Sequence, residues 1–238
     1  MIKLICFVKR HPDLSVDEFH TRWRDVHGPL IADTPAATSR LVRYEQNPRL
    51  ARDYDRPDSP AYDGVAIQWY RSPRDFFDMI ADPGYAKVTA DEQSLLDFDE
   101  LLWMLTEEEE VMIPGPDQRH GTEAKLHCLV KRRPSMDVDD FHRHWREVHG
   151  PLNRDTPTIA RHFVRYEQNH RLARDYARDD TDFDGVAVEW FPSVREFFAM
   201  IAEPDYPEKI APDEPEFMDV DGLRFILTES ERVVLPAI

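Results

Sequence analysis

The chain contains one sequence written twice, and this repeat restricts the fold more than any other feature. Residues 8–30 read VKRHPDLSVDEFHTRWRDVHGPL and residues 130–152 read VKRRPSMDVDDFHRHWREVHGPL, so fifteen of the 23 positions are identical. The segment RYEQN also occurs twice, at 43–47 and at 165–169. The 238 residues are therefore expected to form two copies of one small domain and not one large domain.

We place the two repeats at residues 1–114 and 125–238. Residues 115–124 read GPDQRHGTEA and have no counterpart, and such Pro-, Gly- and polar-rich segments are typical of linkers. Each repeat has the pattern β-α-β-β-α-β, in which two helices cover one face of a four-stranded antiparallel sheet. The sequence thus predicts an α+β protein made of two ferredoxin-like repeats.

In the first repeat, Ser15 and Glu18 have the spacing of a helix capping box, and Gly28-Pro29 is expected to end this helix. A second helix is expected to begin near Ser72-Pro73. Alternating β-branched and apolar residues predict four strands, near 2–8, 41–46, 65–70 and 101–111.

The strands also predict which sheet face the helices cover. That face is expected to stay apolar in both repeats. We assign to it, in the first repeat, Leu4, Cys6, Val8, Val65, Ile67, Trp69, Leu101, Trp103 and Leu105.

The opposite face changes character between the repeats. Ile5 is replaced by His127, Gln68 by Glu189, and Leu102 by Arg224. Polar groups on a half-buried face are costly unless they are paired or hydrated, so we expect a partly polar cavity between the two sheets, with Gln68, His127, Glu189 and Arg224 as substrate-binding residues. Two alternatives stay open: these positions reach the rim of a barrel, or they form a structural ion pair near a strand end.

Composition excludes several classes of partner. With 30 Lys and Arg against 47 Asp and Glu, the net charge is −17, which disfavours nucleic acids and anionic membranes. No apolar run approaches the roughly 20 residues that span a bilayer. Two cysteines form no disulfide framework, so a cytoplasmic location is expected. No HExxH or CxxC motif is present, and no metal site is expected.

Two histidines and two tyrosines are the candidate catalytic residues. His27 and His149 follow the apolar stripe of the first helix of each repeat, and histidine is suited to acid–base chemistry near neutral pH. Tyr44 and Tyr166 lie on a strand, where the hydroxyl could meet a histidine or a substrate oxygen. The alternatives are that the histidines cap their helices and that the tyrosines only pack in the core.

These motifs resemble a known family. The run F-x-x-x-W-R-x-V-H-G-P-L at 19–30 and 141–152, followed by R-Y-x-Q-N, is similar to the EthD family of the dimeric α+β barrel superfamily. The resemblance covers nearly all of both repeats. It implies a barrel of two ferredoxin-like halves packed sheet to sheet, usually from two chains and here from one. It leaves open whether this intrachain pseudo-dimer forms a further homodimer.

The resemblance also implies a class of activity. Relatives degrade small organic molecules or modify aromatic polyketides, by decarboxylation and dehydration among other steps. Our leading hypothesis is therefore a cofactor-independent, lyase-type enzyme that acts by acid–base catalysis on an aromatic or carbonyl-bearing molecule. The alternatives are a non-catalytic protein that binds a hydrophobic metabolite and a monooxygenase, either cofactor-free or haem-dependent, because some members of the superfamily bind haem through a histidine.

Overall fold

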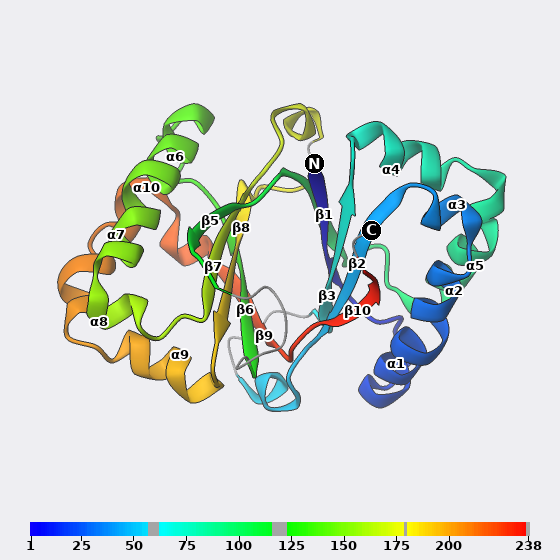
Figure 1. Ribbon diagram of the computed structural model, residues 1–238, viewed down its shortest axis with the longest axis horizontal. Helices are drawn as coiled ribbons and strands as arrows, with labels where there is room; N and C mark the ends of the chain where they lie inside the picture. The colour runs from blue at the N-terminus through cyan, green and yellow to red at the C-terminus, as the bar shows by residue number, and fades with distance from the viewer. Residues whose placement is uncertain (57–61, 116–122, 179, 237–238) are drawn as a thin grey trace. The chain divides into compact units, whose positions relative to one another are not determined.

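The computed structural model describes residues 1–56, 62–115, 123–178 and 180–236. The chain divides into two compact units (Figure 1): unit 1 comprises Met1–Arg49, Ala61–Glu107 and Glu231–Ile238, and unit 2 comprises Leu50–Pro60 and Glu108–Ser230. Each unit has one five-stranded antiparallel sheet with helices packed on it. The predicted α+β class with two ferredoxin-like repeats is confirmed.

Unit 1 has the strand order β10-β2-β3-β1-β4. Its strands are β1 (Ile2–Val8), β2 (Leu41–Pro48), β3 (Gly64–Tyr70), β4 (Leu102–Glu107) and β10 (Arg232–Leu235). Its helices are α1 (Val16–Arg22), the π-helix η1 (Trp23–His27), α2 (Gly28–Ala32), α3 (Pro35–Thr38), α4 (Pro73–Ile80), the 3₁₀-helix η3 (Pro83–Tyr85) and α5 (Ala86–Leu95).

Unit 2 repeats this arrangement with the order β5-β7-β8-β6-β9. Its strands are β5 (Glu110–Ile113), β6 (Ala124–Val130), β7 (Arg165–His170), β8 (Gly185–Phe191) and β9 (Arg224–Thr228). Its helices are η2 (Ala51–Asp55), α6 (Val138–His144), η4 (Trp145–His149), α7 (Gly150–Asp155), α8 (Pro157–Ala160), η5 (Ala173–Ala177), α9 (Val194–Ile201), η6 (Tyr206–Ile210), α10 (Glu214–Phe217) and η7 (Val220–Gly222).

The last strand of each repeat does not join the sheet formed by the rest of that repeat. β5 follows β4 in the chain but pairs with β7, and β10 follows β9 but pairs with β2. The single strand predicted over 101–111 is therefore wrong, because it breaks within the acidic run 107–110 into β4 and β5. The repeat boundaries at 1–114 and 125–238 stay a prediction from sequence, and most of the predicted linker lies outside the described residues.

The first helix of each repeat does not end where predicted. Gly28 has φ −55° and ψ −55°, so the chain continues from η1 into α2. A Cβ atom at Gly28 would lie 3.3 Å from Nε2 of Gln46, so the glycine permits close side-chain packing and does not end a helix. A Cβ atom at the equivalent Gly150 would lie 2.5 Å from Sδ of Met112 and 2.8 Å from Nε2 of Gln168.

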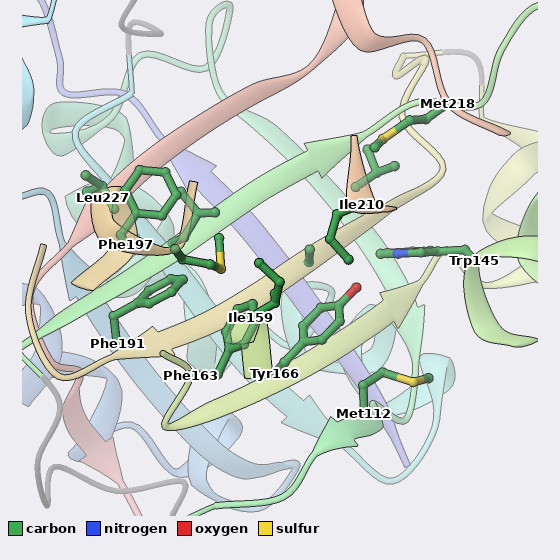
Figure 2. Packing of buried hydrophobic residues seen from close by; sticks show 14 of the residues in the cluster. Met112, Trp145, Ile159, Phe163, Tyr166, Phe191, Phe197, Ile210, Met218 and Leu227 are labelled. Atoms are coloured by element: carbon green, nitrogen blue, oxygen red, sulfur yellow. The ribbon is translucent and has the colours of Figure 1, made fainter. Parts of the chain in front are cut away.

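A cluster of apolar side chains from the sheet and the helices forms the core of unit 2 (Figure 2). Trp145 and Tyr166 are almost fully buried within it, and the ring of Phe163 stacks on Tyr166 with centroids 5.7 Å apart. Gly185 on β8 allows the indole of Trp145 to lie against the strand, because a Cβ atom there would be 2.6 Å from Cζ3 of the ring. This packing fixes the helix that carries His149.

The register of the sheets corrects one predicted face. Leu4 pairs with Gln68, and directly opposed residues share a face, so Gln68 lies on the face covered by helices. Val65, Ile67 and Trp69 lie on the other face, and their predicted assignment is wrong. Both faces of β3 carry apolar residues, so hydrophobicity alone did not distinguish them. Among the described residues, none of the helices is long and apolar enough to cross a membrane.

Candidate functional site

A cavity of about 460 Å³ lies between the sheet and the helices of unit 1. Most of its wall is apolar and comes from the sheet, from η1 and from α4, as shown by Leu4, Trp23, Phe76 and Trp103. The polar residues in the wall are His27, Tyr44, Gln68, Tyr85, Thr89, Glu92 and Gln93. A mostly apolar cavity with a few polar groups is typical of a small-molecule site.

His27 is held at this wall by a carboxylate. Its Nδ1 lies 2.9 Å from Oδ2 of Asp91 on α5, and Nη2 of Arg22 donates to Oδ1 of Asp91 at 3.2 Å. The hydrogen bond from His27 holds the pKa of Asp91 below its ordinary value, so Asp91 is ionised and accepts the proton on Nδ1. Among the described residues no hydrogen-bond partner meets Nε2, which is left free to accept a proton from a ligand.

The position of His27 follows from the π-helix η1. A π-helix shifts the side chains that follow it around the helix axis, and such turns are frequent at functional sites. Nε2 of Gln46 on β2 donates to the carbonyl oxygen of Trp23 at 2.8 Å, which ties the start of η1 to the sheet. The R-Y-x-Q-N motif thus positions the histidine, although its Gln was not among the predicted site residues.

Glu92 follows Asp91 on α5 and also lines the cavity. Burial raises the pKa of Glu92, and the hydroxyl of Tyr85 donates to its Oε1 at 3.1 Å. Glu92 therefore keeps its proton to a higher pH than an exposed glutamate and is suited to act as an acid. One helix thus presents in succession an Asp whose pKa is lowered and a Glu whose pKa is raised.

Tyr44 and Gln68 supply further polar groups. Nε2 of Gln46 donates to the hydroxyl of Tyr44 at 3.2 Å, and burial raises the pKa of Tyr44, so the hydroxyl keeps a proton for a ligand. The hydroxyl of Tyr70 donates to Oε1 of Gln68. This contact fixes the amide of Gln68 and leaves its Nε2 as a donor.

Unit 2 has an equivalent but smaller cavity of about 190 Å³. Nδ1 of His149 lies 3.0 Å from Oδ2 of Asp213, and Nε2 of His144 lies 2.8 Å from its Oδ1. Burial acts to raise the pKa of Asp213, but the hydrogen bonds from His149 and His144 outweigh it and lower the pKa below its ordinary value. The His–Asp pair therefore occurs in both repeats.

In unit 2 the Nε2 atom of His149 has a hydrogen-bond partner. Nδ2 of Asn153 lies 3.2 Å from Nε2 of His149, and it also donates to the carbonyl oxygen of His149 at 3.0 Å. Position 31, the counterpart of Asn153 in unit 1, is Ile. The two histidines thus share an orientation but differ in the availability of Nε2.

A second difference between the repeats concerns Gln68 and Tyr70, whose hydroxyl donates to it. In unit 2 their counterparts are Glu189 and Phe191. Burial, followed by the charge of Glu214, raises the pKa of Glu189 to about 8. Glu214 corresponds to Glu92, its pKa is raised by burial, and the hydroxyl of Tyr206 donates to its Oε1 at 2.7 Å.

The predicted grouping of His127, Glu189 and Arg224 is wrong. Leu126 pairs with Glu189 and His127 pairs with Val188, so Glu189 lies on the helix-covered face and His127 on the other. Nε2 of His127 lies 3.1 Å from Oγ1 of Thr228, and Arg224 is exposed and donates to the carbonyl oxygen of Asp221 at 3.1 Å. Of the predicted set, Glu189 and Gln68 line cavities, but on the face opposite to the predicted one.

Asp91 and Glu92 were not among the residues predicted from the sequence. The helix α5 that carries them has no strong apolar stripe and was not predicted. A signal was nevertheless present, because the dipeptide Asp-Glu recurs at 213–214, at the same offset of 122 that relates 8–30 to 130–152. Within a duplicated chain, polar residues retained in both copies indicate a shared role.

Cys6 and Cys128 also line the cavities but are poor nucleophiles. Burial raises the pKa of the Cys6 thiol to about 12 and also raises the pKa of Cys128. Both are free cysteines. In the described parts of the chain, His, Cys, Asp and Glu side chains form no group of three or more that could hold a metal ion.

Haem fits the unit 1 cavity poorly. Haem carries two propionate carboxylates, which are held most strongly by the charged donors of Lys and Arg. The described residues that line the cavity include no Lys or Arg, and Glu92 adds a carboxyl group of its own. The donor set therefore disagrees with haem, and no step of the reaction below involves it.

Comparisons with known proteins agree with this organisation. A dehydratase named aurZ from Gibberella zeae is 26% identical over 113 residues, covering 42% of this chain and 73% of the relative. An anthrone oxidase-like protein has a similar fold, with a TM-score of 0.64 and 10% identity over 100% of this chain and 95% of its own. A mutant chlorite dismutase from Candidatus Nitrospira defluvii matches with a TM-score of 0.53 and 8% identity over 96% and 90%.

The likeness to the two solved structures concerns the fold and extends over both repeats. The family model described as the EthD domain matches the chain twice, at residues 11–99 and 133–221. Each match contains one His–Asp pair, and the tandem match supports the predicted intrachain pseudo-dimer. The chain belongs to the EthD family.

Proposed function

We propose that the unit 1 cavity is the active site of a cofactor-independent enzyme that eliminates water from a small, largely apolar, carbonyl-bearing molecule. The observation that carries the proposal is the pairing of His27 with Asp91 at the wall of a 460 Å³ cavity, with Nε2 left free and Glu92 next to Asp91 on the same helix. A dehydration requires one base and one acid, and this cavity offers both.

The first step is removal of a proton from the carbon next to the substrate carbonyl. Nε2 of His27 takes the proton, and ionised Asp91 stabilises the imidazolium that forms, because it already accepts the hydrogen bond from Nδ1. The electron pair of the C–H bond moves towards the carbonyl oxygen. The amide of Gln68 or the hydroxyl of Tyr44 would hydrogen-bond to this oxygen as its negative charge develops.

The second step expels the hydroxyl group on the next carbon. Glu92 gives its proton to this hydroxyl, so water leaves and the carbon–carbon double bond forms. His27 then holds one extra proton and Glu92 lacks one, and transfer through solvent restores both. The raised pKa of Glu92 keeps this acid protonated at a pH where an exposed glutamate is ionised.

Unit 2 supports this chemistry less well. Its cavity is smaller, at about 190 Å³, and Nε2 of His149 is bonded to Asn153. We therefore assign turnover to unit 1. The similarity to a dehydratase supports elimination over other lyase reactions, and the apolar wall suits an aromatic substrate. The free cysteines Cys6 and Cys128 suit the reducing cytoplasm, which is where we expect the reaction to take place.

The proposal can be tested with 4-hydroxy-4-phenylbutan-2-one, a β-hydroxy ketone whose dehydration product absorbs in the near ultraviolet. The full chain is expected to accelerate formation of the unsaturated ketone, His27→Ala to remove that acceleration, and His149→Ala to keep it. A protein that binds this ketone or its dehydration product but forms no product would instead be a binding protein. Consumption of oxygen in place of dehydration would indicate a monooxygenase, and either result would overturn the proposal.

A further inference from the structure

The cavity of unit 2 contains acidic groups that the proposed reaction does not use. Glu189 and Glu214 both line it, and none of the described lining residues is Lys or Arg. Tyr206 donates to Glu214, which leaves Glu189 as the carboxyl group without a protein donor in the described chain. A carboxyl group without a partner at the wall of a mostly apolar cavity is costly when ionised, so its presence needs a reason.

The difference between the repeats removes the donor that Glu189 would have. In unit 1 the hydroxyl of Tyr70 donates to Gln68. In unit 2 the tyrosine is replaced by Phe191 and the glutamine by Glu189. Repeat 2 therefore has an acid in place of a neutral amide and, at the same time, lacks the neighbouring hydroxyl that could donate a hydrogen bond to it. Glu189 is arranged to meet a donor that enters the cavity.

Aromatic rings form much of the remaining wall. Phe163 stands where unit 1 has Leu41. Its ring lines the cavity and stacks on the ring of Tyr166 on β7, which also lines it. The faces of aromatic rings attract cations. The other lining rings are Trp145, Phe197, Tyr206, Phe217 and Phe225.

We propose that the unit 2 cavity binds a small organic ammonium ion, with Glu189 as its anionic partner and the aromatic rings packed around its apolar part. The volume of about 190 Å³ suits an amine with a single ring and not a fused polycyclic molecule. Asn153 engages His149, so the ligand is bound and not transformed. This assignment does not depend on the catalytic role of unit 1.

The protonation of Glu189 determines how binding depends on pH. Its pKa of about 8 means that the cavity must release a proton to hold the cation strongly, so affinity for an amine should rise between pH 6 and pH 8. Over this range an aliphatic amine stays charged. The titratable groups that share the cavity wall with Glu189 are Cys128, His149, Tyr166, Tyr206 and Glu214.

A neutral ligand that accepts a hydrogen bond would show the reverse dependence, because only protonated Glu189 donates. The pH profile therefore separates these two classes of ligand. Non-specific attraction to a chain of net charge −17 is separated from the site by Glu189→Gln, which should weaken only binding in the cavity.

The experiment is calorimetric titration of the full chain with benzylamine and with benzyl alcohol, its uncharged analogue, at pH 6, 7 and 8. We expect benzylamine to bind more tightly as the pH rises, and Glu189→Gln to weaken it by about tenfold or more. Glu189→Gln introduces the residue that unit 1 carries at this position.

Binding of benzyl alcohol should be weaker than that of benzylamine and should be unchanged in Glu189→Gln. The inference is overturned if wild-type protein binds the alcohol as tightly as the amine, or does not bind the amine at millimolar concentration. Unchanged affinity of Glu189→Gln for benzylamine would overturn it as well. Far-ultraviolet circular dichroism of the variant checks that the fold is retained.

Discussion

Nδ2 of Asn153 lies 3.2 Å from Nε2 of His149, whereas the residue at the same position in unit 1, Ile31, has no polar side-chain atom. Both histidines are anchored through Nδ1 to an aspartate, so this one residue separates a histidine with a free nitrogen from one with none. A general base needs a free lone pair at the reacting atom. The duplication therefore provides a built-in control for the catalytic role of His27.

The first prediction transfers this contact to unit 1. In Ile31→Asn the new amide should bond to Nε2 of His27 and lower kcat for dehydration by about 100-fold, the lower end of what a general base contributes. Ile31→Val, which keeps the site apolar, should retain most of the activity. Steady-state kinetics with the β-hydroxy ketone compares the two. Equal activity of both variants would show that Nε2 of His27 takes no proton.

The second prediction concerns Asp91, which acts through His27 and not on the substrate. Asp91→Asn removes the charge that stabilises the imidazolium, so kcat should fall by about tenfold or more while KM changes little. Asp213→Asn alters the same contact in unit 2 and should leave kcat unchanged. A matching loss in both variants would instead indicate a structural role for these helices, and thermal unfolding of each variant would then show it.

The third prediction separates the acid from the base. Because burial raises the pKa of Glu92, the acid is protonated below that raised value and the dehydration rate should fall as the pH rises through it. Glu92→Gln should lose dehydration but keep exchange of the α-protons of a simple ketone in D₂O, since exchange needs the base alone. Proton NMR follows the exchange. Loss of exchange in Glu92→Gln would assign proton removal to Glu92.

The repeat and the motifs predicted the fold, because apolar spacing and capping are local properties of the sequence. Ser15 and Glu18 form the predicted capping box, in which Glu18 N donates to Oγ of Ser15 at 3.3 Å. The exchange of β5 and β10 between sheets was not predictable, since a strand carries no local record of its partner. The side of β3 on which Gln68 lies depends on register in the same way.

Only part of the site could be predicted, because local patterns reveal single residues and not the tertiary contacts between them. His27, Tyr44 and Gln68 stood out as polar residues within apolar elements, and the structure brings them to one cavity. Asp91 and Glu92 lie on a helix with polar neighbours, where an acidic residue looks like an ordinary solvated one. Their proximity to His27 is a tertiary contact 64 residues apart in sequence, which no local pattern encodes.

The fourth prediction tests the raised pKa of Glu189 by measuring how the free energy of unfolding depends on pH. In the folded protein this pKa rises from an ordinary value of 4.5 to about 8, so below pH 4.5 the carboxyl group is protonated in both the folded and the unfolded states. Between these values the unfolded state has released the proton and the folded state still holds it. The contribution of Glu189 to the free energy of unfolding therefore falls as the pH rises, by at most about 1.4 kcal/mol per pH unit.

Glutamine does not titrate, so Glu189→Gln should gain stability relative to wild type as the pH is raised from 5 to 8. Urea unfolding of both proteins at pH 5, 6, 7 and 8 measures this difference. The reciprocal change in unit 1, Gln68→Glu, leaves the donor Tyr70 in place. At pH 8 this variant should lose less free energy of unfolding than Gln68→Glu combined with Tyr70→Phe, because the hydroxyl stabilises the carboxylate. A difference between Glu189→Gln and wild type that stays constant with pH would mean that Glu189 is hydrated and that its pKa is close to 4.5.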